Sequence, residues 1–148
     1  MKRNYLKRKY WPTILFTCYL AVLLGITVFR SGFGTHGLCS DGQINLKLFE
    51  AYIPLIRTCD WDRFAYLFIG NLIWFVPLGM YVRYRSTRGG ILRAAVFGLA
   101  LSFFIESMQY LFGTGISELD DLVLNTAGAV LGALSVHILF ILIPPVAR

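Results

Sequence analysis

The chain has 148 residues, of which 57% are hydrophobic and only 15% are charged, with a formal net charge of +6. A soluble domain averages roughly 45–50% apolar and about 25% charged residues, and a small one buries only about two thirds of its surface. The chain is therefore too apolar for a soluble globule, and with 16% aromatic residues it is not a disordered chain either. Its length allows a single domain, residues 1–148, and its composition indicates a membrane protein.

Four stretches of about 20 mostly apolar residues follow one another, each long enough for a helix to cross ~30 Å of hydrocarbon. None shows the strict alternation of a membrane β-strand, and helices satisfy their own backbone groups in lipid. We therefore predict an all-α fold, a polytopic membrane protein with four transmembrane helices over residues 11–29, 64–82, 92–112 and 122–143. The first stretch is longer than the apolar core of a signal peptide and lacks a cleavage site, so we expect an uncleaved helix.

Ten of the 14 basic residues gather on one side of the predicted bundle, and the other four, Arg30, Lys47, Arg57 and Arg63, are spread over a long loop on the other side. The ten precede the first stretch, occupy the Arg83–Arg93 segment between the second and third, and end the chain at Arg148. The loop between the third and fourth stretches carries only the acidic residues Glu118, Asp120 and Asp121. By the positive-inside rule, both termini are expected in the cytoplasm and the acidic loop outside. The net charge thus reflects orientation in a lipid bilayer, and we expect no nucleic-acid partner.

Polar residues interrupt the last three stretches at positions where they are costly. Glu106 lies inside the third stretch, and an acidic side chain in hydrocarbon usually faces protein or water. Helical spacing puts Ser102 and Gln109 on the same face as Glu106, and helical rise puts Asn71 and Asn125 at a similar depth. We therefore predict an outward-facing polar pocket formed by Asn71, Glu106, Gln109, Asp121 and Asn125. The alternative is that these groups only hydrogen-bond between helices, at about 0.6 kcal/mol per contact.

Gly128 and Gly132 have the small-xxx-small spacing that lets a neighbouring helix approach closely, so we predict that they serve helix packing. Cys39 and Cys59 both fall in the segment expected outside, where a disulfide is permitted, and two free thiols are the alternative. The three acidic loop residues could hold a hard cation, but such residues are more commonly solvated. We therefore predict no metal site and no cofactor.

Four segments carry a family resemblance: INLKLF (44–49), NLIWFVPLG (71–79), SFFIESMQ (102–109) and DDLVLNTAGAVLG (120–132). In order and spacing they resemble the VanZ-like family of small bacterial membrane proteins, whose namesake is associated with resistance to teicoplanin. The resemblance covers about residues 45–132. Two positions depart from the family pattern: Leu48 stands where a proline is usual, and Gly115-Ile116-Ser117 lacks the arginine that many members carry before Asp120.

The resemblance implies a multi-pass protein of the bacterial cell membrane, and a non-enzymatic factor in glycopeptide tolerance or cell-envelope function. A lipid or cell-wall precursor headgroup, or the lipoglycopeptide itself, is then the expected partner of the pocket. Glu106 and Asp121 could form an acid–base pair, but no nucleophile accompanies them, so no catalytic residue is predicted. The alternatives are a membrane enzyme acting on envelope lipids and a small proton-coupled exporter. Such exporters often insert in both orientations, whereas the charge bias here favours one.

Overall fold

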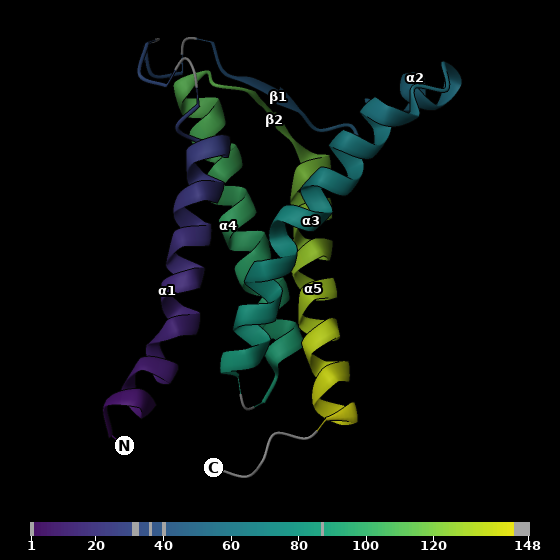
Figure 1. Cartoon of the computed structure of the whole chain (residues 1–148). Helices are drawn as coiled ribbons and strands as arrows, with labels where there is room; N and C mark the ends of the chain where they lie inside the picture. Colours follow the sequence, from purple (N-terminus) through teal and green to yellow (C-terminus); the bar gives the residue numbers. More distant parts are fainter. Residues whose placement is uncertain (1, 31–32, 36, 40, 87, 144–148) are drawn as a thin grey trace.

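Four long helices make up most of the computed structural model, which describes residues 2–30, 33–35, 37–39, 41–86 and 88–143 (Figure 1). They are α1 (Lys2–Thr27), α3 (Trp61–Arg85), α4 (Gly90–Phe112) and α5 (Leu119–Leu142). Within the described residues these are the helices long and apolar enough to cross a membrane. The prediction of an all-α, polytopic membrane protein with four transmembrane helices is confirmed.

The two ends of the bundle differ in what they carry. The start of α1, the end of α5 and the turn between α3 and α4 lie together at one end, here called the termini end (Figure 1). The opposite end carries two short strands and the six-residue helix α2 (Tyr52–Arg57), and is here called the sheet end. An even number of crossings brings both chain ends to one side, while the side of the membrane that they face stays a prediction.

The bundle is closest-packed where α3 meets α5. A Cβ added to Gly128 or Gly132 would overlap the backbone carbonyl of Leu72 or Val76 on α3, so the two helix backbones lie in direct contact there. Gly79 of α3 faces the backbone of α5 in the same way. Gly128 and Gly132 thus lie at the helix interface, as their spacing indicates. The core around this interface consists of Leu23, Val28, Phe75, Leu78, Ile105 and Ala129.

A two-stranded sheet at the sheet end was not predicted. β1 (Gln43–Asn45) pairs in parallel with β2 (Ile116–Glu118), with Gln43 opposite Ile116. Each strand has three residues, too few for an alternating pattern to be visible in the sequence. The segment before the second transmembrane helix is therefore more than a plain loop, since it contributes β1 and α2 to the structure.

Helix α1 is attached to the bundle mainly through its middle. The Tyr19 hydroxyl donates to the backbone oxygen of Trp74 over 2.6 Å, and the ring of Phe16 stacks on Tyr81 with centroids 3.9 Å apart. Only 6% of the Tyr10–Thr27 window is buried, against 39% of α5. Beyond Tyr19, toward the sheet end, α1 and α3 form opposite walls of a cavity.

Candidate functional site

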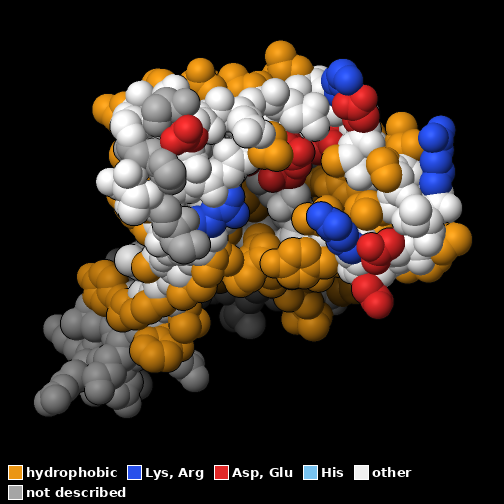
Figure 2. Space-filling model, turned by 90° about the horizontal axis from the view of Figure 1, so that it is seen from above, with side chains coloured by type: hydrophobic (Ala, Val, Ile, Leu, Met, Phe, Trp, Pro, Cys, Tyr) orange, Lys and Arg blue, Asp and Glu red, His pale blue; other side chains and the backbone are white. Residues whose placement is uncertain are grey.

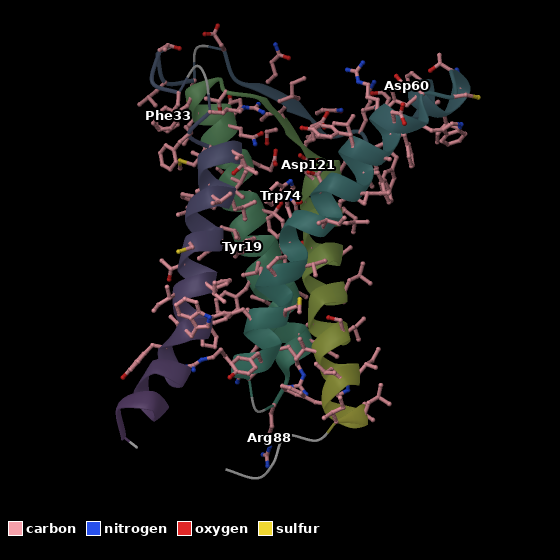
Figure 3. The ribbon with its side chains drawn as sticks, in the orientation of Figure 1. Tyr19, Phe33, Asp60, Trp74, Arg88 and Asp121 are labelled. Atoms are coloured by element: carbon pink, nitrogen blue, oxygen red, sulfur yellow. The ribbon has the colours of Figure 1, made fainter. Side chains whose placement is uncertain are left out.

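A cavity of about 980 Å³ opens at the sheet end and is here called the sheet-end cavity. Its walls come from α1, α2, α3, α4, α5 and the β2 segment, and all five residues of the predicted polar pocket line it: Asn71, Glu106, Gln109, Asp121 and Asn125. Viewed from this end, the molecule shows Asp and Glu side chains in a hollow flanked by Lys and Arg (Figure 2). Asp121 lies above Trp74 and Tyr19, at the opposite end from Arg88 (Figure 3).

Glu106 is buried, with 3% of its surface exposed, on the face of α4 that points into the bundle. Its Oε2 accepts the backbone N–H of Glu118 over 2.8 Å. Glu118 is the residue that precedes α5, so the carboxylate joins α4 to the beginning of that helix.

A second chain of hydrogen bonds crosses from α3 to α5 and α4. The Asn71 side chain donates to the carboxylate of Asp121. The Asn125 amide donates to the Ser102 hydroxyl over 2.9 Å, and that hydroxyl donates to the backbone oxygen of Asp121 over 3.3 Å. Amide and carboxylate groups that would be costly alone in lipid are therefore partnered. The interhelical contacts of the alternative interpretation exist alongside the cavity.

Two arginines that the sequence did not single out also line the cavity. Arg30, just beyond α1, donates through Nε to the backbone oxygen of Thr114. A side chain at Gly115 would collide with the Arg30 guanidinium, so the missing Cβ leaves room for it. Arg63 lies in the first turn of α3 on another wall. Among the described residues neither guanidinium forms an ion pair with a carboxylate.

Gln109 ties the cavity wall to α1. Its amide donates to the backbone oxygen of Thr27 over 3.3 Å, close to where α1 ends. Helix α4 ends shortly after it, at the left-handed C-cap Gly113. Gln109 is therefore both a lining residue and one of the contacts that hold the sheet-end half of α1 in place.

Asp120 does not point to solvent, so the expectation that the acidic loop residues are solvated is wrong for this one. It is 1% exposed, and its Oδ1 accepts the backbone N–H of Phe49 over 2.7 Å. Phe49 has a φ of 57°, a conformation that few non-glycine residues adopt. At the end of β1, the side-chain amide of Asn45 donates to the Glu118 carboxylate over 3.4 Å. The 44–49 motif and the acidic motif, distant in sequence, therefore hold each other.

Tyr52 packs α2 against the sheet-end part of α3. It is buried, and its ring meets those of Phe64 and Phe68 edge-on at 5.7 Å each. Burial, reinforced by the nearby carboxylates of Asp121 and Asp120, raises the pKa of Tyr52 to about 12. The phenol therefore stays protonated at physiological pH and presents a hydroxyl at the cavity wall.

Other predicted features lie apart from this cavity. Cys39 and Cys59 are free and exposed, so the structure has the two-thiol alternative and not the disulfide. The Cys39 N–H bonds to the oxygen of Leu111 at the end of α4, whereas Cys59 lies between α2 and α3. His137 Nδ1 accepts a hydrogen bond from Arg83 Nη2 over 3.1 Å near the termini end. No group of three His, Cys, Asp or Glu residues arranged for a metal occurs in the described part of the chain.

Chemically, the lining offers hydrogen-bond donors, acceptors and charges of both signs. It contains no Ser, Cys, His or Lys among the residues described. Below the polar groups the walls become apolar, with Leu23, Leu67 and Trp74 among them. Such a cavity suits the binding of a molecule with a polar head and an apolar body.

The family VanZ/LLP1 matches the chain over residues 16–141. A relative is the protein named "Protein VanZ" from Enterococcus faecium, which is 27% identical over 118 residues, covering 80% of this chain and 68% of its own length. No solved structure matches the chain.

Proposed function

Because the chain belongs to the VanZ/LLP1 family, we propose that it is a non-enzymatic factor in tolerance to teicoplanin-type glycopeptides or in cell-envelope function. It acts in the bacterial cell membrane, and the sheet-end cavity faces outward and binds its ligand. The observation that carries this proposal is the convergence of Asn71, Glu106, Gln109, Asp121 and Asn125 on that one cavity.

Charge supports the outward orientation of the cavity. Arg83, Arg85 and Arg88 lie at the end of α3 and in the turn that follows it, at the termini end. Basic residues of short loops remain on the cytoplasmic side. The opposite end, with the cavity, then meets the outer leaflet, where both cell-wall precursors and a lipid-bearing antibiotic are within reach.

The lining also favours binding over catalysis. Glu106 already accepts a backbone hydrogen bond, and Asp121 accepts from Asn71, so both carboxylates are engaged in structure. The described lining offers no Ser, Cys or Lys side chain to act as a nucleophile. A ligand held by such groups is recognised and retained, which is sufficient to divert an antibiotic or a precursor.

The test is to express the chain in a susceptible Gram-positive host and measure growth in teicoplanin and in vancomycin. We expect increased tolerance to teicoplanin but not to vancomycin, with no loss when the proton gradient is collapsed. A dependence on the gradient would favour the exporter alternative.

Two variants ask whether the cavity carboxylates matter. Glu106→Gln and Asp121→Asn should accumulate normally, because burying an amide costs less than burying a charge, and should lose tolerance. Glu50→Gln is the matched control, since Glu50 is exposed, pairs with Lys47 over 2.7 Å and lies outside the lining. Full tolerance in both cavity variants would contradict a functional role for the cavity.

A further inference from the structure

The sheet-end cavity has two permanent cations on its walls. Arg30 enters from the α1 side and Arg63 from the first turn of α3. Guanidinium groups stay protonated under all physiological conditions and match the geometry of a phosphate through paired N–H donors. The Nε of Arg30 donates to the Thr114 carbonyl, which fixes the side chain, and within the described residues no carboxylate pairs with its terminal nitrogens.

The depth of these cations corresponds to the polar surface of a bilayer. Arg63 is the third residue of α3, and Arg30 lies three residues beyond Thr27, the last residue of α1. Trp74, at the floor of the cavity, is eleven residues below Arg63 along the helix, or about 16 Å at 1.5 Å per residue. The cavity therefore runs from headgroup level into the region of acyl chains.

The lower part of the cavity is suited to hydrocarbon. Leu23 and Ile26 of α1 face Leu67 and Trp74 of α3 across it. Below this level the Tyr19 hydroxyl donates to the backbone oxygen of Trp74, and this hydrogen bond holds α1 against α3. Since α1 is the least buried of the four helices, the space between α1 and α3 is the side on which an acyl chain would meet the bilayer.

The carboxylates add a requirement on the ligand. Glu106, Glu118 and Asp121 line the same cavity, and their oxygens accept hydrogen bonds that a bare anion cannot donate. Each accepts a hydrogen bond from the protein, and their remaining acceptor capacity suits hydroxyl or amine donors. A headgroup that bears both a phosphate and hydroxyl donors would bind the arginines through its phosphate and the acidic residues through its hydroxyl groups.

We propose that the cavity binds a phospholipid whose headgroup carries hydroxyl donors, with the phosphate on Arg30 and Arg63 and an acyl chain leaving between α1 and α3. This inference rests on the proposed function, because it names the class of ligand for the same cavity. The inference requires that the cavity bind the phosphate and the hydrocarbon chain of one molecule at the same time.

The test uses the full chain, purified in detergent, stripped of lipid and titrated with phosphatidylglycerol in native mass spectrometry. We expect phosphatidylglycerol to bind at least about tenfold more tightly than diacylglycerol of the same chains, since hydrogen bonds to charged groups are the strong ones. Glycerol phosphate, which has the head without the chains, should bind weakly. Equal binding of diacylglycerol, or glycerol phosphate binding as tightly as the lipid, would overturn the proposal.

Arginine variants locate the phosphate. Arg63→Gln should weaken phosphatidylglycerol binding about tenfold, and Arg30→Gln at least as much. Arg57→Gln is the matched control, because Arg57 is an exposed arginine at the same end but outside the lining. Arg30 also bonds to the backbone, so the Arg63 variant decides the question if Arg30→Gln is poorly folded. Unchanged binding in Arg63→Gln would contradict the phosphate position.

Lipid binding and drug tolerance are measured separately, so their failures can be told apart. A chain that confers tolerance but does not bind phosphatidylglycerol contradicts this inference alone. A chain that binds the lipid, loses it in Arg63→Gln and has no effect on tolerance contradicts the proposed function and leaves the ligand assignment standing.

Discussion

The contact between α3 and α5 can be tested by a single methyl group. In Gly128→Ala the new Cβ would overlap the carbonyl of Leu72 on the opposing backbone. Relief requires the two helices to separate, because neither backbone can rotate away as a side chain could. Overpacking of this kind costs about 1–3 kcal/mol, while alanine regains up to about 1 kcal/mol of helix propensity. The expected net loss is about 1–2 kcal/mol of unfolding free energy.

Gly25→Ala provides the matched control, since a Cβ on Gly25 of α1 meets nothing within 4 Å. That variant should be as stable as the parent, or slightly more stable, because alanine favours the helix. The purified proteins are heated in detergent and the fraction that stays monodisperse is measured. The midpoint temperature of Gly128→Ala should be roughly 3–8 °C below that of the parent. Equal midpoints for the two variants would refute the direct backbone contact of α3 and α5.

Three further outcomes are expected. Asp120→Ala leaves the N–H of Phe49 without its acceptor and should cost about 1.5–3 kcal/mol, seen as faster amide exchange at Phe49. Exchange there should not change in Glu50→Gln. On intact cells, a membrane-impermeant thiol reagent should label the exposed Cys39 or Cys59. It should not label the cysteine of an Arg88→Cys variant in which Cys39 and Cys59 are replaced by serine, and the reverse pattern would overturn the predicted orientation. The mass of the unlabelled protein should not change on reduction, and a gain of two hydrogens would show a disulfide between Cys39 and Cys59.

The membrane helices were predictable because the signal that defines them is local. A helix must be about 20 apolar residues long to cross the bilayer, and this requirement is visible in any one stretch. The polar face of α4 was equally visible, since Ser102, Glu106 and Gln109 recur at helical spacing and are costly in lipid. The sequence therefore indicated which residues face inward before any contact between helices was known.

The remaining features depend on contacts between distant segments. Arg30 and Arg63 look like ordinary basic residues near helix ends, and only the packing of α1 against the bundle makes them lining residues. Asp120 looks like a solvated loop carboxylate until the backbone of Phe49 is placed against it. β1 and β2 are separated by two transmembrane helices, so no local pattern could pair them.

Glu106 joins the two interpretations that the sequence left open. One oxygen bonds to the Glu118 N–H and holds the start of α5, which is the structural role, and the side chain also lines the cavity. Glutamine keeps a carbonyl oxygen that can accept the same N–H, so Glu106→Gln preserves the structural contact and removes only the ionisable carboxyl group. Alanine would remove both the carboxyl group and the acceptor of the Glu118 N–H. The glutamine variant, and not the alanine variant, therefore separates bundle stability from ligand binding. Normal accumulation without tolerance assigns the function to the carboxyl group of Glu106. Normal accumulation with tolerance assigns Glu106 to structure alone.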